Sequence, residues 1–200
     1  MAWLQPVTLV GEHATLEPLA QQHETALARA AADGELWRLW YTTVPRPDAV
    51  GAEIGRRLGL MSSGSMLPFA IRATASGEPV GMTTYMNVDA SNRRVEIGST
   101  WLASSAQRGP VNTECKLMLL RHAFETLACN AVEFRTHVMN RQSRAAIERL
   151  GAKLDGILRS HMVLANGTLR DTAVYSVIRG EWPAVRSNLE WQLVKWGQPC

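Results

Sequence analysis

The chain contains few of the residues that mark several large classes of protein. Its 200 residues include three cysteines, Cys115, Cys129 and Cys200, which are widely spaced and form no C-x-x-C pair. Neither a disulfide framework nor a zinc site is therefore indicated, and reduced thiols are expected. Apolar runs are interrupted by Arg, Glu or Asp, and the first twenty residues carry neither a basic leader nor an apolar block. We therefore expect no membrane span and a cytoplasmic protein.

Lysine is also scarce, which argues against nucleic acid as the main partner. Three lysines stand among 21 basic residues, against 18 acidic residues, so the net charge is +3 and the pI about 9.0. The arginines are spread along the chain and form no basic stripe. A nucleic-acid-binding module is a minor alternative, which would require a salt-sensitive affinity for DNA or RNA. The five histidines show no H-x-x-x-H pairing, so no metal cofactor is expected.

The hydrophobic fraction of 46% suits a globular protein, and we expect a single domain over residues 1–200. Alternation of apolar and polar residues predicts the strands. They are a bent pair within residues 8–19, then 67–72, 80–88, 95–102, 132–138, 154–164 and 168–178. Apolar residues at helical spacing predict the helices. They are 23–32, a helix capped by Asp48, 112–128 capped by Asn112, 142–150, and a closing helix with Pro183 in its first turn.

The order of these elements predicts an α/β fold of mixed α+β character. A central mixed, mostly antiparallel sheet contains one βαβ crossover and is flanked by helices. Ligands of such sheets bind at the C-terminal ends of the strands. The loop 103–112 follows the strand 95–102 and leads into the longest helix, whose N-terminus offers free N–H groups and a partial positive charge. This loop is therefore a candidate phosphate site, and an ordinary loop and cap is the alternative.

The strand VEIGSTWL, the loop after it and the helix TECKLMLLRHAFETL resemble the acetyl-CoA-binding core of the GNAT superfamily of acyl-CoA-dependent N-acyltransferases. The resemblance implies a single-domain GNAT fold with acetyl-CoA as co-substrate. It also implies that the strand end accepts the pantetheine amide and that a Q/R-x-x-G-x-G/A loop wraps the pyrophosphate. The cofactor-binding residues implied are Trp101, Leu102, Ala103, Gln107, Arg108, Gly109, Val111 and Asn112.

The loop departs from the family pattern at two positions. Gln107 matches the first motif position, but Pro110 stands where the family has Gly, and Asn112 where it has Gly or Ala. Proline has no N–H and a fixed φ, so one backbone donor is missing and the loop is stiffer than usual. Weaker or reshaped CoA binding is one expectation from these departures.

A second block, Asn140 to Ser143 followed by RAAIERLGAKLDGILR, resembles the N-x-x-S…LGF/A segment of the ribosomal-protein (Rim-like) N-terminal acetyltransferase branch. That branch implies that Asn140 binds the pantetheine arm. It also implies that Ser143 lies near the thioester sulfur, as a general acid for the departing thiolate. Asn140 is equally a good helix N-cap with Ser143 three residues on, so local hydrogen bonding is the alternative for both.

Acyl transfer to an amine requires the amine to be neutral, so a carboxylate or an ordered water has to take a proton. Glu96 occupies the strand position where many GNAT members carry such a base, and a solvated strand glutamate is the alternative. We expect Trp37, Trp40 and Tyr41 to wall the entry of the acceptor, with Tyr85 as a further substrate-binding residue. Core packing is the alternative for these aromatic side chains.

The sequence therefore predicts an enzyme that transfers an acetyl group from acetyl-CoA to a primary amine, by direct attack of the amine. The acceptor is open between a protein N-terminus and a small-molecule amine. A non-catalytic acyl-CoA-binding regulatory domain is the alternative, favoured by Pro110 and Asn112. The sequence leaves both a monomer and a homodimer open.

Overall fold

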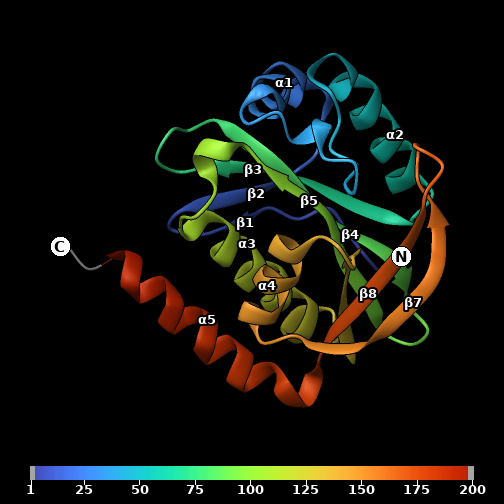
Figure 1. The fold of residues 1–200 in the computed structure, drawn as a ribbon. Helices are drawn as coiled ribbons and strands as arrows, with labels where there is room; N and C mark the ends of the chain where they lie inside the picture. Colours follow the sequence, from blue (N-terminus) through green and yellow to red (C-terminus); the bar gives the residue numbers. More distant parts are fainter. Residues whose placement is uncertain (1–2, 198–200) are drawn as a thin grey trace.

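The computed structural model describes residues 3–197, which form an eight-stranded sheet covered by helices on both faces (Figure 1). The strands are β1 (Leu9–Val10), β2 (Ala14–Pro18), β3 (Met66–Ala73), β4 (Pro79–Asp89), β5 (Arg94–Leu102), β6 (Ala131–His137), β7 (Lys153–Val163) and β8 (Leu169–Ile178). The helices are α1 (Glu24–Ala32), α2 (Val50–Ser62), α3 (Pro110–Arg121), α4 (Arg141–Leu150) and α5 (Trp182–Gly197). The predicted α/β fold with mixed α+β character is confirmed. Among the described residues, no helix combines the length and the apolar character needed to cross a bilayer.

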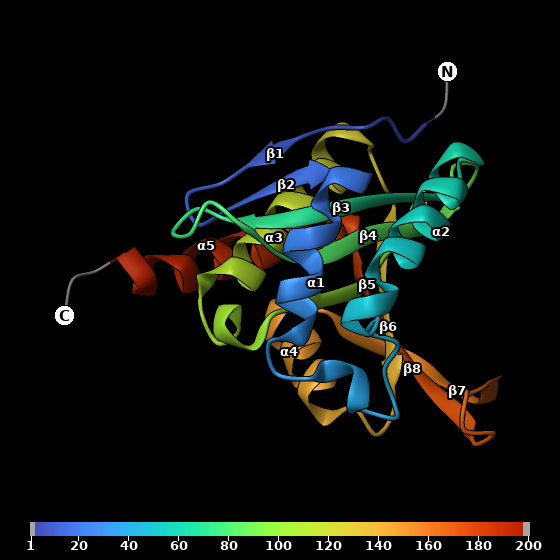
Figure 2. The same cartoon turned by 90° about the horizontal axis from the view of Figure 1, so that it is seen from above.

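The helices form two layers. α1 and α2 lie on one face of the sheet, whereas α3, α4 and α5 lie on the other (Figures 1 and 2). Each layer has its own core, because strand side chains alternate between the two faces. Leu27 and Ile54 pack with Met82 of β4 on the first face. Leu119 and Leu189 belong to the core of the opposite face. The central strands are therefore apolar on both sides.

Strand order is β1-β2-β3-β4-β5-β6-β8-β7. Neighbouring strands are antiparallel except β5 and β6, which are parallel and connected through α3. The predicted closing hairpin is present, with Gly167 at a φ of 80° in its turn. β8 rather than β7 pairs with β6, so the hairpin leaves β7 as an exposed edge strand.

The predicted cap of the longest helix is wrong. α3 begins at Pro110, two residues before the predicted start, and its N-cap is Gly109 rather than Asn112. Proline suits the first helical position, because its fixed φ is helical and the N–H it lacks has no partner there. The helix also ends earlier in α-helical form, at Arg121, and a π-helical turn, His122–Thr126, follows it.

Asp48 does not cap α2 either. It lies inside a 3₁₀ turn, Pro47–Ala49, that precedes the helix, and its Oδ1 accepts a hydrogen bond from Arg46 Nε at 3.3 Å. The N-cap is Ala49, which makes no side-chain cap hydrogen bond. Pro47 favours this turn, because its ring presets the first helical φ one turn before the apolar pattern begins.

Candidate active site

β5 and β6 begin as a parallel pair and then separate. Their register pairs end at Glu96 opposite Glu133, although β5 continues to Leu102 and β6 to His137. Beyond this point β5 pairs only with β4 and β6 only with β8 among the described strands, and we call the two strand ends that no longer pair with each other the wedge. α3 follows β5 and α4 follows β6, so both helices start at the C-terminal ends of the strands, where ligands of such sheets bind. The unpaired backbone groups of the wedge require partners, and a ligand between the strands would supply them.

Of the three residues predicted to bind the pantetheine arm at the end of β5, two direct their backbone groups away from the wedge. The Ala103 N–H donates to the Val80 carbonyl at 2.8 Å, and the Trp101 carbonyl lies against Gly81, where a Cβ would collide with it. Both groups therefore face β4, and the Trp101 side chain is buried in the core beneath α1. Alternation turns the backbone of Leu102 the other way, toward the wedge. Of these three residues, Leu102 is the one whose backbone can bind the pantetheine arm as predicted. The prediction that Trp101 and Ala103 also bind the arm is corrected.

The predicted phosphate loop ends in the first turn of α3. Gly109 is the N-cap and has no side chain to cap the helix, and Arg108 before it has a φ of 59°. The N–H groups of Val111 and Asn112 lie in the first turn, where a helix has no carbonyl four residues back to accept them. Pro110 supplies no N–H. This turn therefore offers an anion two backbone donors and the positive end of the helix dipole.

Gln107 links the two sides of the wedge. Its Nε2 donates to the Leu102 carbonyl at 2.9 Å. Its Oε1 accepts from Nε2 of Gln142, in the first turn of α4, at 3.5 Å. Gln142 is not among the predicted site residues, and its one signal in the sequence is its place between Asn140 and Ser143. This bridge holds the end of β5 in place relative to the start of α4.

Asn140 caps α4. Its Oδ1 accepts the backbone N–H of Ser143 at 3.0 Å, which is the local hydrogen bond that the sequence offers as an alternative to cofactor binding. The cap uses only the oxygen of the side-chain amide. Within residues 3–196, no hydrogen bond engages the Asn140 Nδ2 group or the Ser143 hydroxyl. Both groups are therefore available to a ligand, and both predicted roles stay predictions.

A serine at position 140 separates the cap from the cofactor contact, because Ser caps a helix about as well as Asn but has no amide donor. We expect Asn140→Ser to weaken CoA binding about tenfold, by loss of one hydrogen bond, and to leave Tm nearly unchanged. Asn140→Ala should also lower the free energy of unfolding by roughly 1 kcal/mol, because the cap is lost. Calorimetric titration with CoA and thermal melts measure the two effects. Equal CoA affinity in Asn140→Ser and the parent would leave Asn140 as a cap alone.

Glu96 is a buried carboxylate, so the alternative of a solvated strand glutamate is wrong. Its side chain is 6% exposed, and Arg135 Nε lies 3.5 Å from its Oε2. The same oxygen accepts from Asn87 Nδ2 at 2.6 Å. Burial raises the pKa of Glu96, against the lowering effects of Asn87 and Arg135. Its Oε1 points toward Gly98, where a Cβ would lie 2.7 Å away, so this oxygen is directed to the unpaired part of β5.

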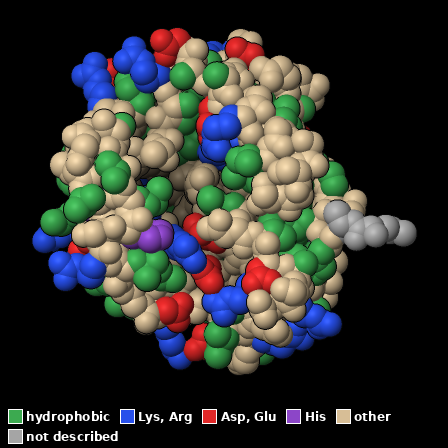
Figure 3. Space-filling model, turned by 90° about the vertical axis from the view of Figure 1, so that its right-hand side faces the viewer, with side chains coloured by type: hydrophobic (Ala, Val, Ile, Leu, Met, Phe, Trp, Pro, Cys, Tyr) green, Lys and Arg blue, Asp and Glu red, His purple; other side chains and the backbone are tan. Residues whose placement is uncertain are grey.

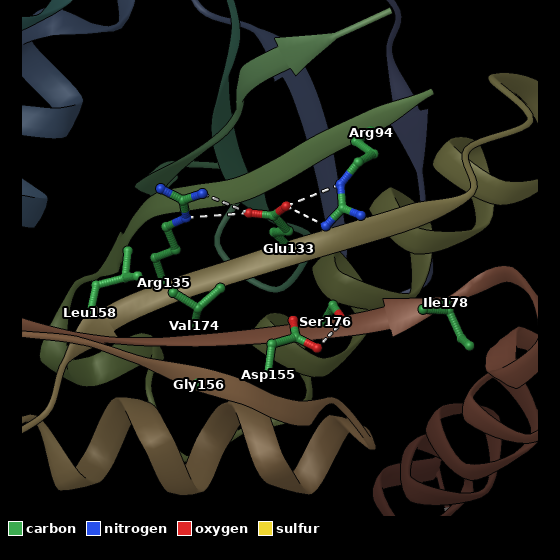
Figure 4. Close-up of a pocket in the computed structure, with 9 residues that line it drawn as sticks. All are labelled: Arg94, Glu133, Arg135, Asp155, Gly156, Leu158, Val174, Ser176 and Ile178. Atoms are coloured by element: carbon green, nitrogen blue, oxygen red, sulfur yellow. Dashed lines mark hydrogen bonds and ion pairs between the residues drawn. The ribbon is translucent and has the colours of Figure 1, made fainter. Parts of the chain in front are cut away.

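A second carboxylate, Glu133, lies opposite Glu96 in the parallel register. It lines a cavity of about 360 Å³ between β5, β6, β8 and β7 (Figure 4). Arg94 Nη2 donates to its Oε1 at 2.5 Å and Arg135 Nη2 to its Oε2 at 2.9 Å. Burial alone would raise the pKa of Glu133, but the two guanidinium groups lower it. The two carboxylates are thus shifted in opposite directions, and Glu96 is the one suited to exchange a proton.

The aromatic linker between α1 and α2 reaches the end of β6. The rings of Trp40 and Tyr41 lie 5.2 and 6.5 Å from the His137 imidazole, between ring centroids. His137 is 4% exposed, and its Nδ1 accepts the Met139 N–H at 3.1 Å. Its Nε2 has no partner among the described residues. Trp40 and Tyr41 thus lie beside the end of β6, together with His137, which had no sequence signal, and their role in walling the acceptor entry stays a prediction. No ring contact within residues 3–196 joins Trp37 to this cluster.

Tyr85 does not line the site. Its side chain is fully buried between β4 and α3, and its hydroxyl donates to the Leu119 carbonyl at 2.5 Å. The expectation of a substrate contact is corrected in favour of core packing. The Tyr175 hydroxyl also has protein partners. It accepts a hydrogen bond from Arg144 Nε at 2.9 Å and donates one to Glu148 at 2.7 Å.

The two described cysteines are not suited to act as nucleophiles or metal ligands. Cys115 and Cys129 are free thiols and are buried, and Cys200 lies outside the described residues. Burial raises the pKa of Cys115 to about 12 and that of Cys129 to about 11, so both stay protonated near neutral pH. In the part of the chain that the structure describes, no three His, Cys, Asp or Glu residues are grouped to hold a metal ion.

Figure 3 shows the face of the molecule that lies on the right-hand side of Figure 1. The face is hollowed near its centre, and basic, acidic and histidine side chains lie around the hollow. Both signs of charge are present, in keeping with the ion pairs of Glu133 with Arg94 and Arg135. Such a surface does not select strongly for a polyanion or a polycation.

The fold and the wedge define a protein of the acyl-CoA-dependent acyltransferase class. The family model for the acetyltransferase (GNAT) domain matches residues 13–153. This match covers more than half of the chain and includes β5, α3, β6 and α4. The protein therefore belongs to the GNAT acetyltransferase family, and the resemblance seen in the sequence is confirmed.

A curated protein is similar to about half of this chain. The chain is 36% identical over 107 residues to the protein named "Putative ribosomal N-acetyltransferase YdaF" of Bacillus subtilis (strain 168). The match covers 53% of this chain and 57% of that protein, so the chain spans little more than half the length of this relative.

Solved structures share the fold over nearly the whole chain. A GCN5-related N-acetyltransferase from Brucella melitensis is 33% identical, with a TM-score of 0.83, and the match covers 94% of this chain and 85% of that one. An acetyltransferase structure from T. thermophilus is 35% identical, with a TM-score of 0.82 and coverage of 96% and 99%. RimJ of Mycobacterium smegmatis, solved with CoA-disulfide, is 23% identical with a TM-score of 0.78, covers 94% and 95%, and shows the fold alone.

Proposed function

We propose that this protein transfers an acetyl group from acetyl-CoA to a primary amine, by direct attack of the amine on the thioester. The observation that carries the proposal is the wedge, in which pairing between β5 and β6 stops at Glu96 while the uncapped start of α3 follows β5. Unpaired strand backbone binds amides, and free N–H groups at a helix start bind phosphate. An extended ligand with amide groups and an anionic end therefore suits this site. Membership of the GNAT family supports the assignment.

The residues present fit acetyl-CoA, which supplies an activated acetyl group as a thioester when it is bound. The N–H groups of Val111 and Asn112 would hold the pyrophosphate. The backbone of Leu102 and the free amide donor of Asn140 would hold the pantetheine arm. Pro110 removes one donor, but it occupies the first helical position without disturbing the helix start. The departure from the family motif therefore reduces the number of contacts and preserves the anion site.

Glu96 is the general base in this proposal. An ammonium group cannot attack, so a proton has to leave the nitrogen before or during attack. The raised pKa of Glu96 makes its carboxylate a stronger base than an exposed glutamate. The C–N bond then forms, the C–S bond breaks and the nitrogen gives up its second proton. The thiolate takes up a proton, for which Ser143 is the proposed source, and the proton released by the nitrogen restores the Ser143 hydroxyl. Backbone N–H groups of β5 would stabilise the charge that develops on the carbonyl oxygen.

For the acceptor, we propose the N-terminal amine of a protein ahead of a small-molecule amine. The likeness to the relative named as a ribosomal N-acetyltransferase supports this order. A free-thiol release assay with acetyl-CoA tests it, using N-terminal peptides, polyamines and amino acids at equal concentration. Turnover of peptides above the other amines is the expected result. Turnover of polyamines alone would reverse the order.

CoA is expected to raise Tm, because a ligand that binds only the folded protein stabilises it by mass action. At a hundredfold excess over Kd the gain is about 2.7 kcal/mol, which for a chain of this length is roughly 5–11 °C. Thermal melts with CoA measure it, with inorganic pyrophosphate as the control. An equal shift with pyrophosphate, or none with CoA, would contradict the cofactor site.

A non-catalytic acyl-CoA-binding domain is the second candidate, and the specific observation in its favour is Pro110 in place of a motif glycine. Turnover of any amine in the thiol-release assay excludes it. The homodimer and the cytoplasmic location stay predictions. β7 is an exposed edge strand, a feature that often pairs with another chain. Light scattering on the purified protein decides between monomer and dimer.

A further inference from the structure

Lys116 is a buried cation in the second turn of α3. Its side chain is 6% exposed, and its Nζ donates to Thr100 Oγ1 at 2.7 Å and to Thr83 Oγ1 at 3.3 Å. The two threonine oxygens lie 2.7 Å apart. Within residues 3–196, no carboxylate forms an ion pair with Lys116. Buried charges are normally paired, so this cation needs an explanation.

The numbers of protons on Lys116, Thr83 and Thr100 determine which group donates in each hydrogen bond of this cluster. An ammonium group can only donate, so both threonine oxygens accept from Lys116, and each hydroxyl still has one proton to place. Thr83 is fully buried, and among the described residues its hydroxyl has one other oxygen partner, that of Thr100, so Thr83 donates to Thr100. The Thr100 proton is then left over. Its remaining acceptor in the described chain is the Gly98 carbonyl at 3.4 Å, which is a long contact.

Thr100 lies in the wedge. It comes after the last β5–β6 pair and is half-buried. Its neighbour Ser99 has a φ of 48°, at the point where the register between β4 and β5 shifts. The buried Arg57 of α2 donates to the Ser99 carbonyl at 3.3 Å. Two buried cations, Arg57 from α2 and Lys116 from α3, therefore hold this irregular part of β5, and the Thr100 hydroxyl is fixed in place.

We propose that the Thr100 hydroxyl donates a hydrogen bond to the sulfur of the departing thiolate, and that Lys116 is a positioning residue that orients and polarises this hydroxyl. The inference rests on the proposed function. Thr100 lies two residues, about 7 Å, further into the wedge than Leu102. Three bonds join the last amide nitrogen of the pantetheine arm to its sulfur, so an arm held at Leu102 brings the sulfur near Thr100.

The step balances without a further reactant. The nitrogen loses two protons in all. Glu96 takes the first from the ammonium group before attack, and the second leaves the nitrogen after it has bonded to the carbonyl carbon, which balances the proton that the sulfur takes up. The C–S bond breaks, its electron pair stays on sulfur, and the thiolate later takes one proton to become the CoA thiol. Thr100 keeps its own proton throughout and acts through a hydrogen bond. This assignment is compatible with Ser143 as the source of the proton.

The charge around Lys116 supports the proposal. Burial lowers the pKa of Lys116 to about 8, so most of the side chain is still charged at pH 7. The groups that contact Nζ from β4 and β5 are neutral hydroxyls, and the titratable neighbour on its own helix, Cys115, stays protonated. The positive charge is therefore not neutralised locally, and it favours a negative charge on a nearby sulfur.

The pKa of the thiol in bound CoA tests this directly and requires no acceptor. Thiolate absorbance in the ultraviolet is titrated for the enzyme–CoA complex, and the titration of free enzyme is subtracted. We expect bound CoA to be a stronger acid than free CoA. Thr100→Val and Lys116→Met should each lower the acid dissociation constant of bound CoA about tenfold, while Thr100→Ser retains the parent value. Thr172→Val is the matched control, because it removes a buried threonine hydroxyl of β8 that bonds Arg170 instead of Lys116, and it should leave the constant unchanged.

Turnover gives an independent measure. Thr100→Val should lower kcat about tenfold with little change in KM for acetyl-CoA, because the lost hydrogen bond forms only as charge develops. An unchanged thiol pKa in Thr100→Val that still binds CoA would overturn the proposal. If Lys116→Met fails to fold, the comparison of Thr100→Val with Thr100→Ser still decides. Absence of CoA binding in the parent protein would instead contradict the proposed function.

Discussion

Glu96→Gln is expected to lower turnover about a hundred- to ten-thousandfold while CoA affinity stays nearly unchanged. Glutamine keeps the shape of the side chain and can still accept from Asn87, but it cannot take a proton from the amine. The reaction then depends on amine that is already neutral in solution. The difference in turnover rate between the variant and the parent should therefore become smaller as the pH rises from 6 to 9. Steady-state rates of both proteins across this range, with an acceptor found in the peptide panel, provide the measurement.

The stability of the same variant separates a catalytic role from a structural one. Burial raises the pKa of Glu96 in the folded state, so the folded protein binds more protons than the unfolded chain. Stability is then lost as pH rises from the unfolded pKa through the raised folded pKa, and the ionised carboxylate is unfavourable above that interval. Glu96→Gln is therefore expected to keep or raise Tm at pH 8. Glu96→Asp, a shorter proton acceptor, should recover part of the turnover. Full activity of Glu96→Gln at neutral pH would remove Glu96 from the mechanism.

Glu114→Ala is expected to lower the free energy of unfolding by about 3 kcal/mol or more. The buried Glu114 carboxylate, on α3, accepts the N–H groups of Glu12, His13 and Ala14 at 2.8, 2.7 and 2.7 Å. Hydrogen bonds to a charged group contribute about 1.5–3 kcal/mol each, although the more exposed donors would regain water in the variant. For a chain of this length, 3 kcal/mol corresponds to a fall in Tm of roughly 6–12 °C.

An exposed carboxylate provides the matched control for Glu114. Glu190 on α5 pairs with Arg121 at 3.0 Å, and both side chains are exposed. Ion pairs of this kind contribute less than about 1 kcal/mol, so Glu190→Ala should hardly change Tm. Denaturant unfolding of the two variants gives the comparison. Equal stability would show that the turn between β1 and β2 finds its hydrogen bonds elsewhere.

The predictions that the structure contradicts have a common physical origin, in residues that lie outside the local pattern. Asn112 and Asp48 are good cap residues, yet Gly109 and Ala49 are the N-caps. Cap preferences amount to about 1 kcal/mol, and here a proline one or two residues before the predicted cap starts each helical segment. Tyr85 was expected at the site because a hydroxyl suggests function, but its partner is a carbonyl of α3 that no local pattern indicates.

In the site too, some residues can be recognised from the local sequence and others only from their partners in distant segments. Glu96, Gln107 and Asn140 could be named from the sequence, because a family motif places them at a strand or a helix start. His137 and Lys116 could not. Their significance comes from partners in other segments, such as Trp40 for His137 and Thr100 for Lys116. The burial that raises the pKa of Glu96 also depends on side chains brought by β4 and β6.

Local patterns in the sequence were enough to predict the order of strands and helices, the parallel crossover through α3 and the free N–H groups at the start of that helix. These follow from alternation, helical spacing and proline geometry, which act over a few residues. The position of β8 between β6 and β7, and the end of β5–β6 pairing at Glu96, became known from the folded chain. The neighbour of each strand is selected by the burial of whole faces of the sheet. Alternation of apolar and polar residues has the same period in every strand, so it does not identify which strand pairs with which. The wedge exists because two strands that pair at one end are held apart at the other, which no local pattern records.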